Sequence, residues 1–174
     1  MTAERLAALR RELAQARDEL SAALAAADPA LLTAPGLVGE WSARELVAHL
    51  AHWNDWASTC VAAAADGQLG DLVTDTWDVD AQNAEVARDV ASMPMSAIRD
   101  READSYARLA ERLWAFDPSL LEMPAPWGGT VEGIVIENGP AHYAEHVRHV
   151  RDWFAGADED DEDEEPPAED PADR

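Results

Sequence analysis

Five histidines are the residues of this sequence best suited to metal chemistry, and they fall in two short segments. His49 and His52 lie in the first segment, and His142, His146 and His149 lie in the second. On a helix that turns by about 100° per residue, the last three project into one sector. Two imidazoles four residues apart can bind one metal ion, a spacing found in helical zinc sites. The second segment therefore predicts two ligands, His142 and His146.

A third ligand is expected from the first segment. His49 shares the inward stripe of a predicted helix with Leu50 and Trp53. Three histidine ligands leave a coordination position for water or substrate, which is typical of catalytic zinc sites. Neutral imidazole suits Zn, Ni and Fe, so the residue types alone do not choose the metal. The alternative is that the spacing arises by chance and that the histidines are solvated on an acidic surface.

The other polar residues near these histidines have two interpretations each. His52 and His149 stand three residues after a predicted ligand, where they could contact it, but a place at the rim of the site is the better interpretation. Glu145 and Asp55 could orient an imidazole by accepting its N–H. On so acidic a chain, we expect both to be solvated carboxylates.

Four residues are candidates for contact with a substrate. Trp53 and Trp56 follow His49 on the same predicted helix, Trp127 precedes the last histidine segment, and Asn138 lies one turn before it. Burial in the core is the simplest role for Trp53, which we include as a candidate. We expect Trp56, Trp127 and Asn138 to line the pocket.

The histidine segments lie on two of four long helices that the sequence predicts. Leucines at three- and four-residue spacing predict the first helix over residues 3–26, before Asp28 and Pro29. The second runs to about residue 65, and its first residues, Ser42 to Glu45, have the form of a capping box.

The second half of the chain contains a short helix and two long ones. The short helix is predicted over residues 79–90, and the third long helix begins after Pro94 and ends before Asp117-Pro118. The fourth is predicted over residues 131–154, with a kink at Gly139-Pro140.

These elements predict an all-α fold, a four-helix bundle with a short accessory helix. The connection from Gly67 to Val79 is long enough for a crossover along the bundle. We expect residues 1–156 to form one domain. After Gly156 the composition is dominated by Asp, Glu, Pro and Ala, so residues 157–174 are expected to be a disordered acidic tail.

Composition limits the partners of this chain. The 174 residues carry a formal net charge of -23, so nucleic acid is not an expected partner. The single cysteine, Cys60, cannot form an intramolecular disulfide and is expected to be a small buried hydrophobic residue. No targeting or membrane-spanning segment is evident, so we expect a cytoplasmic protein with no membrane partner. Nucleotide-binding and Ser or Cys hydrolase motifs are absent as well.

Two segments resemble the DinB-like superfamily, which includes the N-terminal domain of mycothiol-dependent maleylpyruvate isomerase. Residues 41–50, WSARELVAHL, are similar to the start of its second helix. Residues 137–146, ENGPAHYAEH, are similar to its last helix, especially in the ClbS/DfsB-like branch, and residues 77–90 resemble the short connecting helix of that branch. The resemblance covers about residues 3–155 and implies metal-binding histidines at His49, His142 and His146.

The resemblance also implies a function. Members often bind Zn, Ni or another divalent ion, and their activities include thiol-dependent isomerisation or transfer and protection against reactive small molecules. We expect a divalent metal, first of all Zn with Ni or Fe as alternatives, a small-molecule substrate and a mycothiol-like cofactor. One alternative is a non-catalytic bundle that sequesters a hydrophobic small molecule among its tryptophans. Another is a homodimer in which the leucines of the first helix face a partner.

Overall fold

The computed structural model describes residues 2–72 and 78–162, with side chains up to residue 156. Within these ranges the chain forms α-helices and short 3-10 turns and contains no β-strand, so the all-α prediction is confirmed. The helices are α1 (Thr2–Ala26), α2 (Ala43–Ala65), α3 (Val79–Val90), α4 (Met95–Ala115), α5 (Val131–Asn138) and α6 (Pro140–Glu162). None of them, within the described ranges, is long and apolar enough to cross a membrane.

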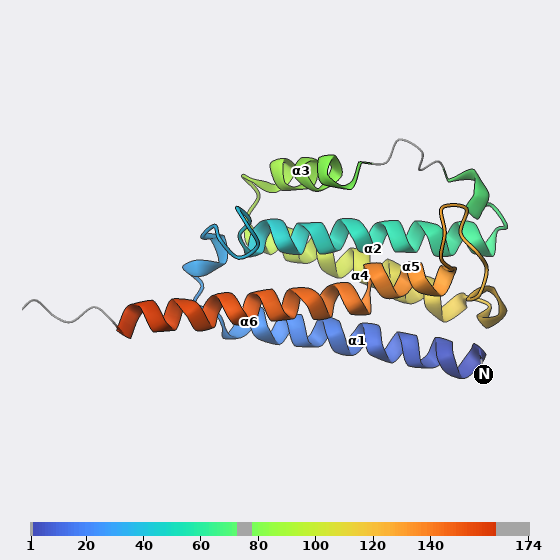
Figure 1. Ribbon diagram of the computed structural model, residues 1–174, viewed down its shortest axis with the longest axis horizontal. Helices are drawn as coiled ribbons and strands as arrows, with labels where there is room; N and C mark the ends of the chain where they lie inside the picture. Colours follow the sequence, from blue (N-terminus) through green and yellow to red (C-terminus); the bar gives the residue numbers. More distant parts are fainter. Residues whose placement is uncertain (1, 73–77, 163–174) are drawn as a thin grey trace, which may run out of the picture.

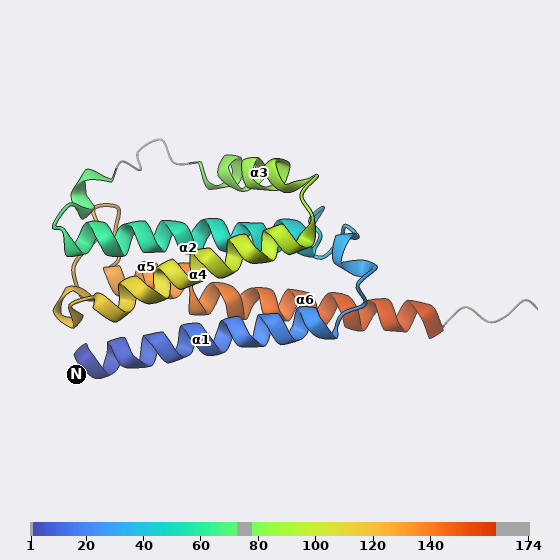
Figure 2. The ribbon, with the colours of Figure 1, turned by 180° about the vertical axis from the view of Figure 1, so that it is seen from behind.

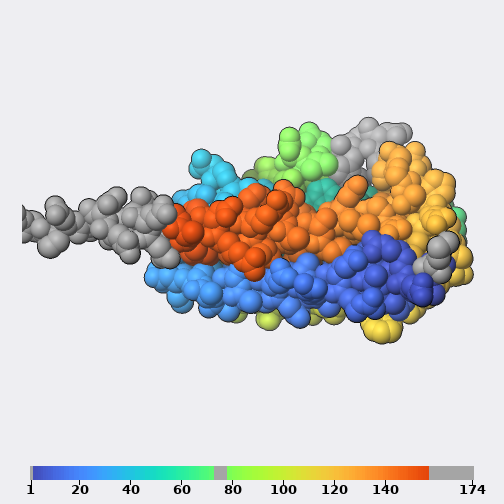
Figure 3. Space-filling model, turned by 60° about the horizontal axis from the view of Figure 1, so that its bottom comes forward, coloured from blue at the N-terminus to red at the C-terminus, as the bar shows by residue number. Residues whose placement is uncertain are grey.

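Four long rods form the bundle, namely α1, α2, α4 and the pair α5 and α6 (Figure 1). α1 packs along α6 and α2 packs along α4. In the space-filling view, α1 and α6 lie side by side and together form one face of the molecule (Figure 3). The predicted four-helix bundle is therefore confirmed, and α3 is its short accessory helix.

α3 carries the chain back along the bundle. Because of this return, α2 and α4 run in the same direction, as both ribbon views show (Figures 1 and 2). α3 packs against α2 on the side away from α1. The length of the connection from Gly67 to Val79 allowed a crossover, and the chain does cross over here. Residues 73–77 of this connection, including Trp77 of the segment resembling the DinB-like superfamily, lie outside the described ranges.

The start of α2 follows directly from the local sequence. Ser42 Oγ accepts a hydrogen bond from the amide of Arg44 at 3.2 Å, and the Glu45 carboxylate accepts one from the amide of Ser42 at 2.9 Å. These bonds form the predicted capping box and satisfy amides that the first helical turn leaves without partners.

The fourth rod consists of two helices where we predicted one kinked helix. α5 ends at Asn138 and α6 begins at Pro140, which lacks the amide hydrogen needed to continue the helix. Gly139 fits between them because a Cβ there would lie 2.7 Å from the carbonyl oxygen of Val135. α6 also continues past the predicted end at residue 154, up to Glu162. The prediction of a disordered tail was therefore wrong for residues 157–162, which are helical. Residues 163–174 lie outside the described ranges, so disorder there stays a prediction.

The inward face of α1 supplies much of the core. Its leucines are at most 6% exposed, and they pack within the protein's own bundle. They are Leu6, Leu9, Leu13, Leu20 and Leu24. A homodimer in which these side chains face a partner is therefore wrong, since they are not available at the surface.

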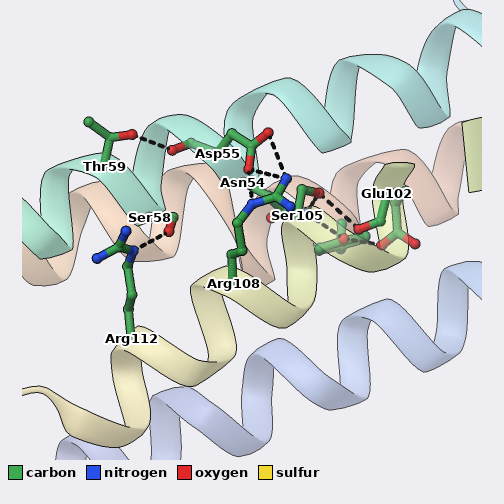
Figure 4. Close-up of polar contacts among 9 residues, drawn as sticks. Asn54, Asp55, Ser58, Thr59, Glu102, Ser105, Arg108 and Arg112 are labelled. Atoms are coloured by element: carbon green, nitrogen blue, oxygen red, sulfur yellow. Dashed lines mark hydrogen bonds and ion pairs between the residues drawn. The ribbon is translucent and has the colours of Figure 1, made fainter. Parts of the chain in front are cut away.

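A buried polar network joins all four rods. Asn54 of α2 donates to the hydroxyl of Tyr143 in α6 at 2.7 Å, and that hydroxyl donates to Glu102 of α4. Arg17 of α1 donates to both carboxylate oxygens of Glu102, at 2.9 Å each. Figure 4 shows the α2 and α4 members of this network beside the more exposed contacts of the same two helices. Burial and the neighbouring Glu102 carboxylate raise the pKa of Tyr143, so its hydroxyl stays protonated.

Candidate metal centre

Three imidazoles from two helices meet inside the bundle. One ring nitrogen from each of His49, His142 and His146 can be chosen so that all three lie within 4.8 Å of one another. His49 Nε2 and His142 Nε2 are 2.8 Å apart, and the ring centroids of His142 and His146 are 4.8 Å apart. His49 comes from α2, and the other two come from the first turns of α6, which the break at Gly139 positions. The convergence expected from the sequence is therefore observed.

Burial keeps these rings neutral. His49 is 8% exposed and His146 is 5% exposed, while His142 is half-buried. Burial lowers the pKa of His49 to about 4, against an ordinary value of 6.5, although its hydrogen bond to Asn83 raises it. Burial and the neighbouring imidazoles lower the pKa of His142 to about 3 and that of His146 to about 2. Each ring therefore has one unprotonated nitrogen at neutral pH, which is the form that binds metals.

The donor set fits a divalent cation. His142 Nδ1 and His146 Nε2 are buried and have no hydrogen-bond partner within residues 2–72 and 78–162. Buried polar atoms are normally paired, so such atoms are candidates to bind an ion. Two nitrogens bound to one Zn²⁺ at about 2.0–2.1 Å lie roughly 3.3 Å apart in tetrahedral geometry. This spacing lies between the 2.8 Å that separates His49 Nε2 from His142 Nε2 and the 4.8 Å within which one nitrogen of each ring lies.

Three further side chains surround His49 and were not all expected. Asn83 of α3 lies with its Oδ1 3.0 Å from His49 Nδ1, and the indole nitrogen of Trp53 is 3.1 Å from the same oxygen. The ring of Trp41 stands 5.0 Å from that of His49, measured between centroids. Asn83 and Trp41 were not predicted to lie at this site. Residue spacing gave no sign of Asn83, because its contact depends on how α3 docks on α2.

The polar residues near the histidines were expected either to contact a predicted ligand or to lie at the rim of the site, and both outcomes are observed. His149 Nδ1 lies 3.1 Å from His146 Nδ1, so this histidine contacts a predicted ligand and is not merely at the rim. His52 instead pairs with Gln82 Oε1 at 3.1 Å. Asp55 forms an ion pair with Arg108 at 2.8 Å (Figure 4). Glu145 is exposed, as expected for a solvated carboxylate.

The predicted substrate-contact residues occupy different surroundings. Trp53 is buried, as its simplest role required. Trp56 and Trp127 lie together, with ring centroids 5.9 Å apart, and Trp127 is 38% exposed. Asn138 donates its amide hydrogen to the carbonyl of Ile134 at 2.8 Å, within α5. Their contact with a substrate stays a prediction.

Cys60 matches its expected structural role. It is fully buried in α2, and burial raises the pKa of its thiol to about 12. A thiol with so high a pKa is a poor nucleophile at neutral pH. Cys60 is therefore a core residue.

Comparison with protein families agrees with this arrangement. The sequence model of the mycothiol maleylpyruvate isomerase N-terminal domain matches residues 13–152. The chain belongs to this family. The match to the mycothiol maleylpyruvate isomerase N-terminal domain includes all three candidate ligands and the crossover helix α3. It confirms the resemblance to the wider DinB-like group.

A solved structure has a similar fold. The crystal structure of an uncharacterised protein from Escherichia coli UTI89 superposes with a TM-score of 0.74 and 17% sequence identity, over 88% of this chain and 94% of that one. At this identity the likeness concerns the fold alone. The comparison with curated proteins gives no match.

Proposed function

We propose that this protein is a metal-dependent enzyme that activates water or a low-molecular-weight thiol against an electrophilic small molecule, in detoxification or a stress response. His49, His142 and His146 are the proposed ligands of one divalent cation, with Zn the first candidate and Ni or Fe the alternatives. The observation that carries the proposal is the convergence of three neutral imidazoles, two of them buried and one half-buried, with one nitrogen of each within 4.8 Å of the others.

The chemistry follows from an open coordination position. A divalent cation with three imidazole ligands can lower the pKa of a water or thiol that binds beside it, which supplies a nucleophile near neutral pH. The name of the family refers to a mycothiol-dependent isomerase, so a mycothiol-like thiol is the first cofactor to test. Trp56, Trp127 and Asn138 are the proposed pocket residues, and Trp53 contributes through its contact with His49.

The first experiment measures the metal itself. Protein purified without added metal is analysed for its divalent ions by mass spectrometry, beside the variants His142→Ala and Trp114→Ala. Trp114 is 71% exposed on α4, so the second variant controls for surface substitution. We expect close to one divalent ion per chain in the wild type and in Trp114→Ala, and a clearly lower content in His142→Ala, which lacks one of three ligands. A wild type that binds no divalent ion after Zn, Ni and Fe are offered would refute the proposal.

The second experiment tests the reaction class. Metal-loaded protein is incubated with a thiol-reactive electrophile and either mycothiol or no thiol, and consumption of the electrophile is followed. We expect consumption above the uncatalysed rate that falls to that rate in His142→Ala. Metal binding without any such consumption would favour a binding protein.

The second candidate function is non-catalytic binding of a hydrophobic small molecule. The observation in its favour is the pair of neighbouring indoles, Trp56 and Trp127, the latter partly exposed. Its signature would be quenching of tryptophan fluorescence by an apolar ligand, equal in the wild type and in His142→Ala.

A further inference from the structure

The helix α3 reaches the candidate metal centre with one carboxamide. Asn83 is half-buried in the middle of α3, and its Oδ1 lies 3.0 Å from His49 Nδ1 and 3.1 Å from the indole nitrogen of Trp53. Both neighbours belong to α2 and stand four residues apart on one face of that helix. The carboxamide therefore lies directly behind a predicted ligand, on the side away from the other two histidines.

The contacts of the Asn83 oxygen favour one tautomer of His49. The indole N–H of Trp53 can only donate, and two acceptors are within reach, Asn83 Oδ1 at 3.1 Å and His49 Nδ1 at 3.2 Å. A carboxamide oxygen can only accept, so Asn83 Oδ1, 3.0 Å from His49 Nδ1, is satisfied by a hydrogen on that nitrogen, and the indole then donates to the same oxygen. A neutral imidazole holds one hydrogen, which leaves His49 Nε2 with its lone pair. That nitrogen is the one 2.8 Å from His142.

We propose that Asn83 is a positioning residue that holds His49 in the tautomer able to bind a cation through Nε2. This inference rests on the proposed metal site and adds to it the group that orients one ligand. Metal-binding histidines commonly donate their second N–H to an oxygen, and loss of that partner typically weakens metal affinity by about 10- to 100-fold.

The position of Asn83 also links the cation to the docking of α3. The hydrogen bond from His49 to Asn83 connects the predicted ligand to α3, which also contacts α2 through Gln82 and His52 and buries Val86 and Val90 in the core. Coupling between two events is reciprocal, so whatever α3 docking adds to cation affinity, the cation returns to α3 docking. Hydrogen exchange of the α3 amides should therefore slow when the cation binds.

The test uses three variants of the full chain. Asn83→Leu removes the acceptor and keeps a side chain of similar size, and Asn83→Asp restores an acceptor. Gln82→Leu is the matched control, because Gln82 is the preceding residue of α3, is also half-buried, and contacts His52 rather than a predicted ligand. Circular dichroism and thermal unfolding verify that each variant is folded.

Three readouts are expected to move together. Competition with a chelator should show Zn²⁺ affinity about 10- to 100-fold lower in Asn83→Leu, at least wild-type affinity in Asn83→Asp, and unchanged affinity in Gln82→Leu. Long-range ¹H–¹⁵N spectra of the metal-free wild type should show His49 with its hydrogen on Nδ1, and Asn83→Leu should lose this signature. Slower α3 exchange on adding Zn²⁺ should be seen in the wild type and not in Asn83→Leu.

Two failures can be told apart. If the wild type binds Zn²⁺ and Asn83→Leu binds it equally well with the same His49 tautomer, the role of Asn83 is refuted and the metal site stands. If the wild type binds no divalent cation, the proposed function fails, and the role of Asn83 fails with it.

Discussion

Each imidazole of the candidate metal centre is a base that the folded chain keeps neutral. The unfolded chain has no such restriction, so its histidines take up protons near the ordinary pKa of 6.5. Folding therefore competes with protonation below that pH. A bound cation would occupy the same lone pairs and remove the competition, which makes the metal-free protein the sensitive form.

The metal-free protein should lose stability as the pH falls below about 6.5. The folded pKa of His49 is about 4 and those of His142 and His146 are lower, so between pH 6 and pH 4 the unfolded state binds more protons. The free energy of unfolding then falls by up to about 1.4 kcal/mol per pH unit for each such ring. Above the histidine pKa of the unfolded chain, the free energy of unfolding should not depend on the protonation of these rings.

Urea unfolding in the presence of a chelator, at several values between pH 7.5 and pH 4.5, measures this slope. The variant His146→Gln keeps a polar side chain without a titrating group, so its slope should be smaller by about one proton. Equal slopes in the wild type and His146→Gln would contradict the neutral, buried state of that ring.

Residue spacing predicted which histidines converge but not the residues that support them. His142 and His146 are recognisable because four residues on a helix bring two side chains to one face, and His49 because it lies on an apolar stripe. Asn83 and Trp41 have no such local signal. Their contacts depend on how α3 and the loop before α2 dock, which is a tertiary property.

At the scale of the elements, the break between α5 and α6 is a packing requirement. Gly139→Ala would place a methyl group 2.7 Å from the carbonyl oxygen of Val135 and 3.1 Å from Leu13, so the backbone must shift. We expect the free energy of unfolding to fall by about 1–3 kcal/mol, as for other overpacked sites.

Gly133→Ala in α5 is the matched control for this variant. A Cβ at Gly133 meets only Thr130 Oγ1 at an ordinary 3.6 Å, so alanine should raise stability by about 0.5–1 kcal/mol through its helix propensity. Chemical denaturation of both variants measures the difference. A neutral Gly139→Ala would contradict the close approach.

Helix boundaries were largely predictable, and polar contacts between helices were not. The capping box at Ser42 and the boundaries of α3 follow from residues adjacent in sequence. The link of Tyr143 to Glu102 joins residues 41 positions apart. The sequence therefore gave no sign of this link, which depends on how the helices of the bundle pack together.

At the scale of the whole molecule, the described core does not extend into the acidic end of the chain. Its last fully buried residue is Val150, and Trp153 and Phe154 pack against its edge. We expect a chain ending at Gly156 to unfold with a free energy within about 0.5 kcal/mol of the full chain. Urea unfolding at moderate salt compares the two.

Light scattering on the same pair of proteins checks the oligomeric state. We expect both proteins to have the same number of chains per particle, since the truncation leaves the faces of the bundle unchanged. A loss of more than about 1 kcal/mol on truncation would show that the acidic segment contributes to the fold.

The direction of the helices also came from tertiary structure. The sequence allowed a crossover by the length of one connection, but only the packing of α3 on α2 sets α2 and α4 parallel.

The parallel arrangement of α1 and α6 has a practical consequence for protein engineering. Their shared direction places the start of α1 and the far end of α6 toward opposite ends of the bundle (Figures 1 and 2). At a rise of about 1.5 Å per residue, α1 alone extends over roughly 37 Å. Two reporter domains fused at these ends would be kept apart by a stiff spacer, whereas a circular permutant would need a linker long enough to run back along the whole bundle.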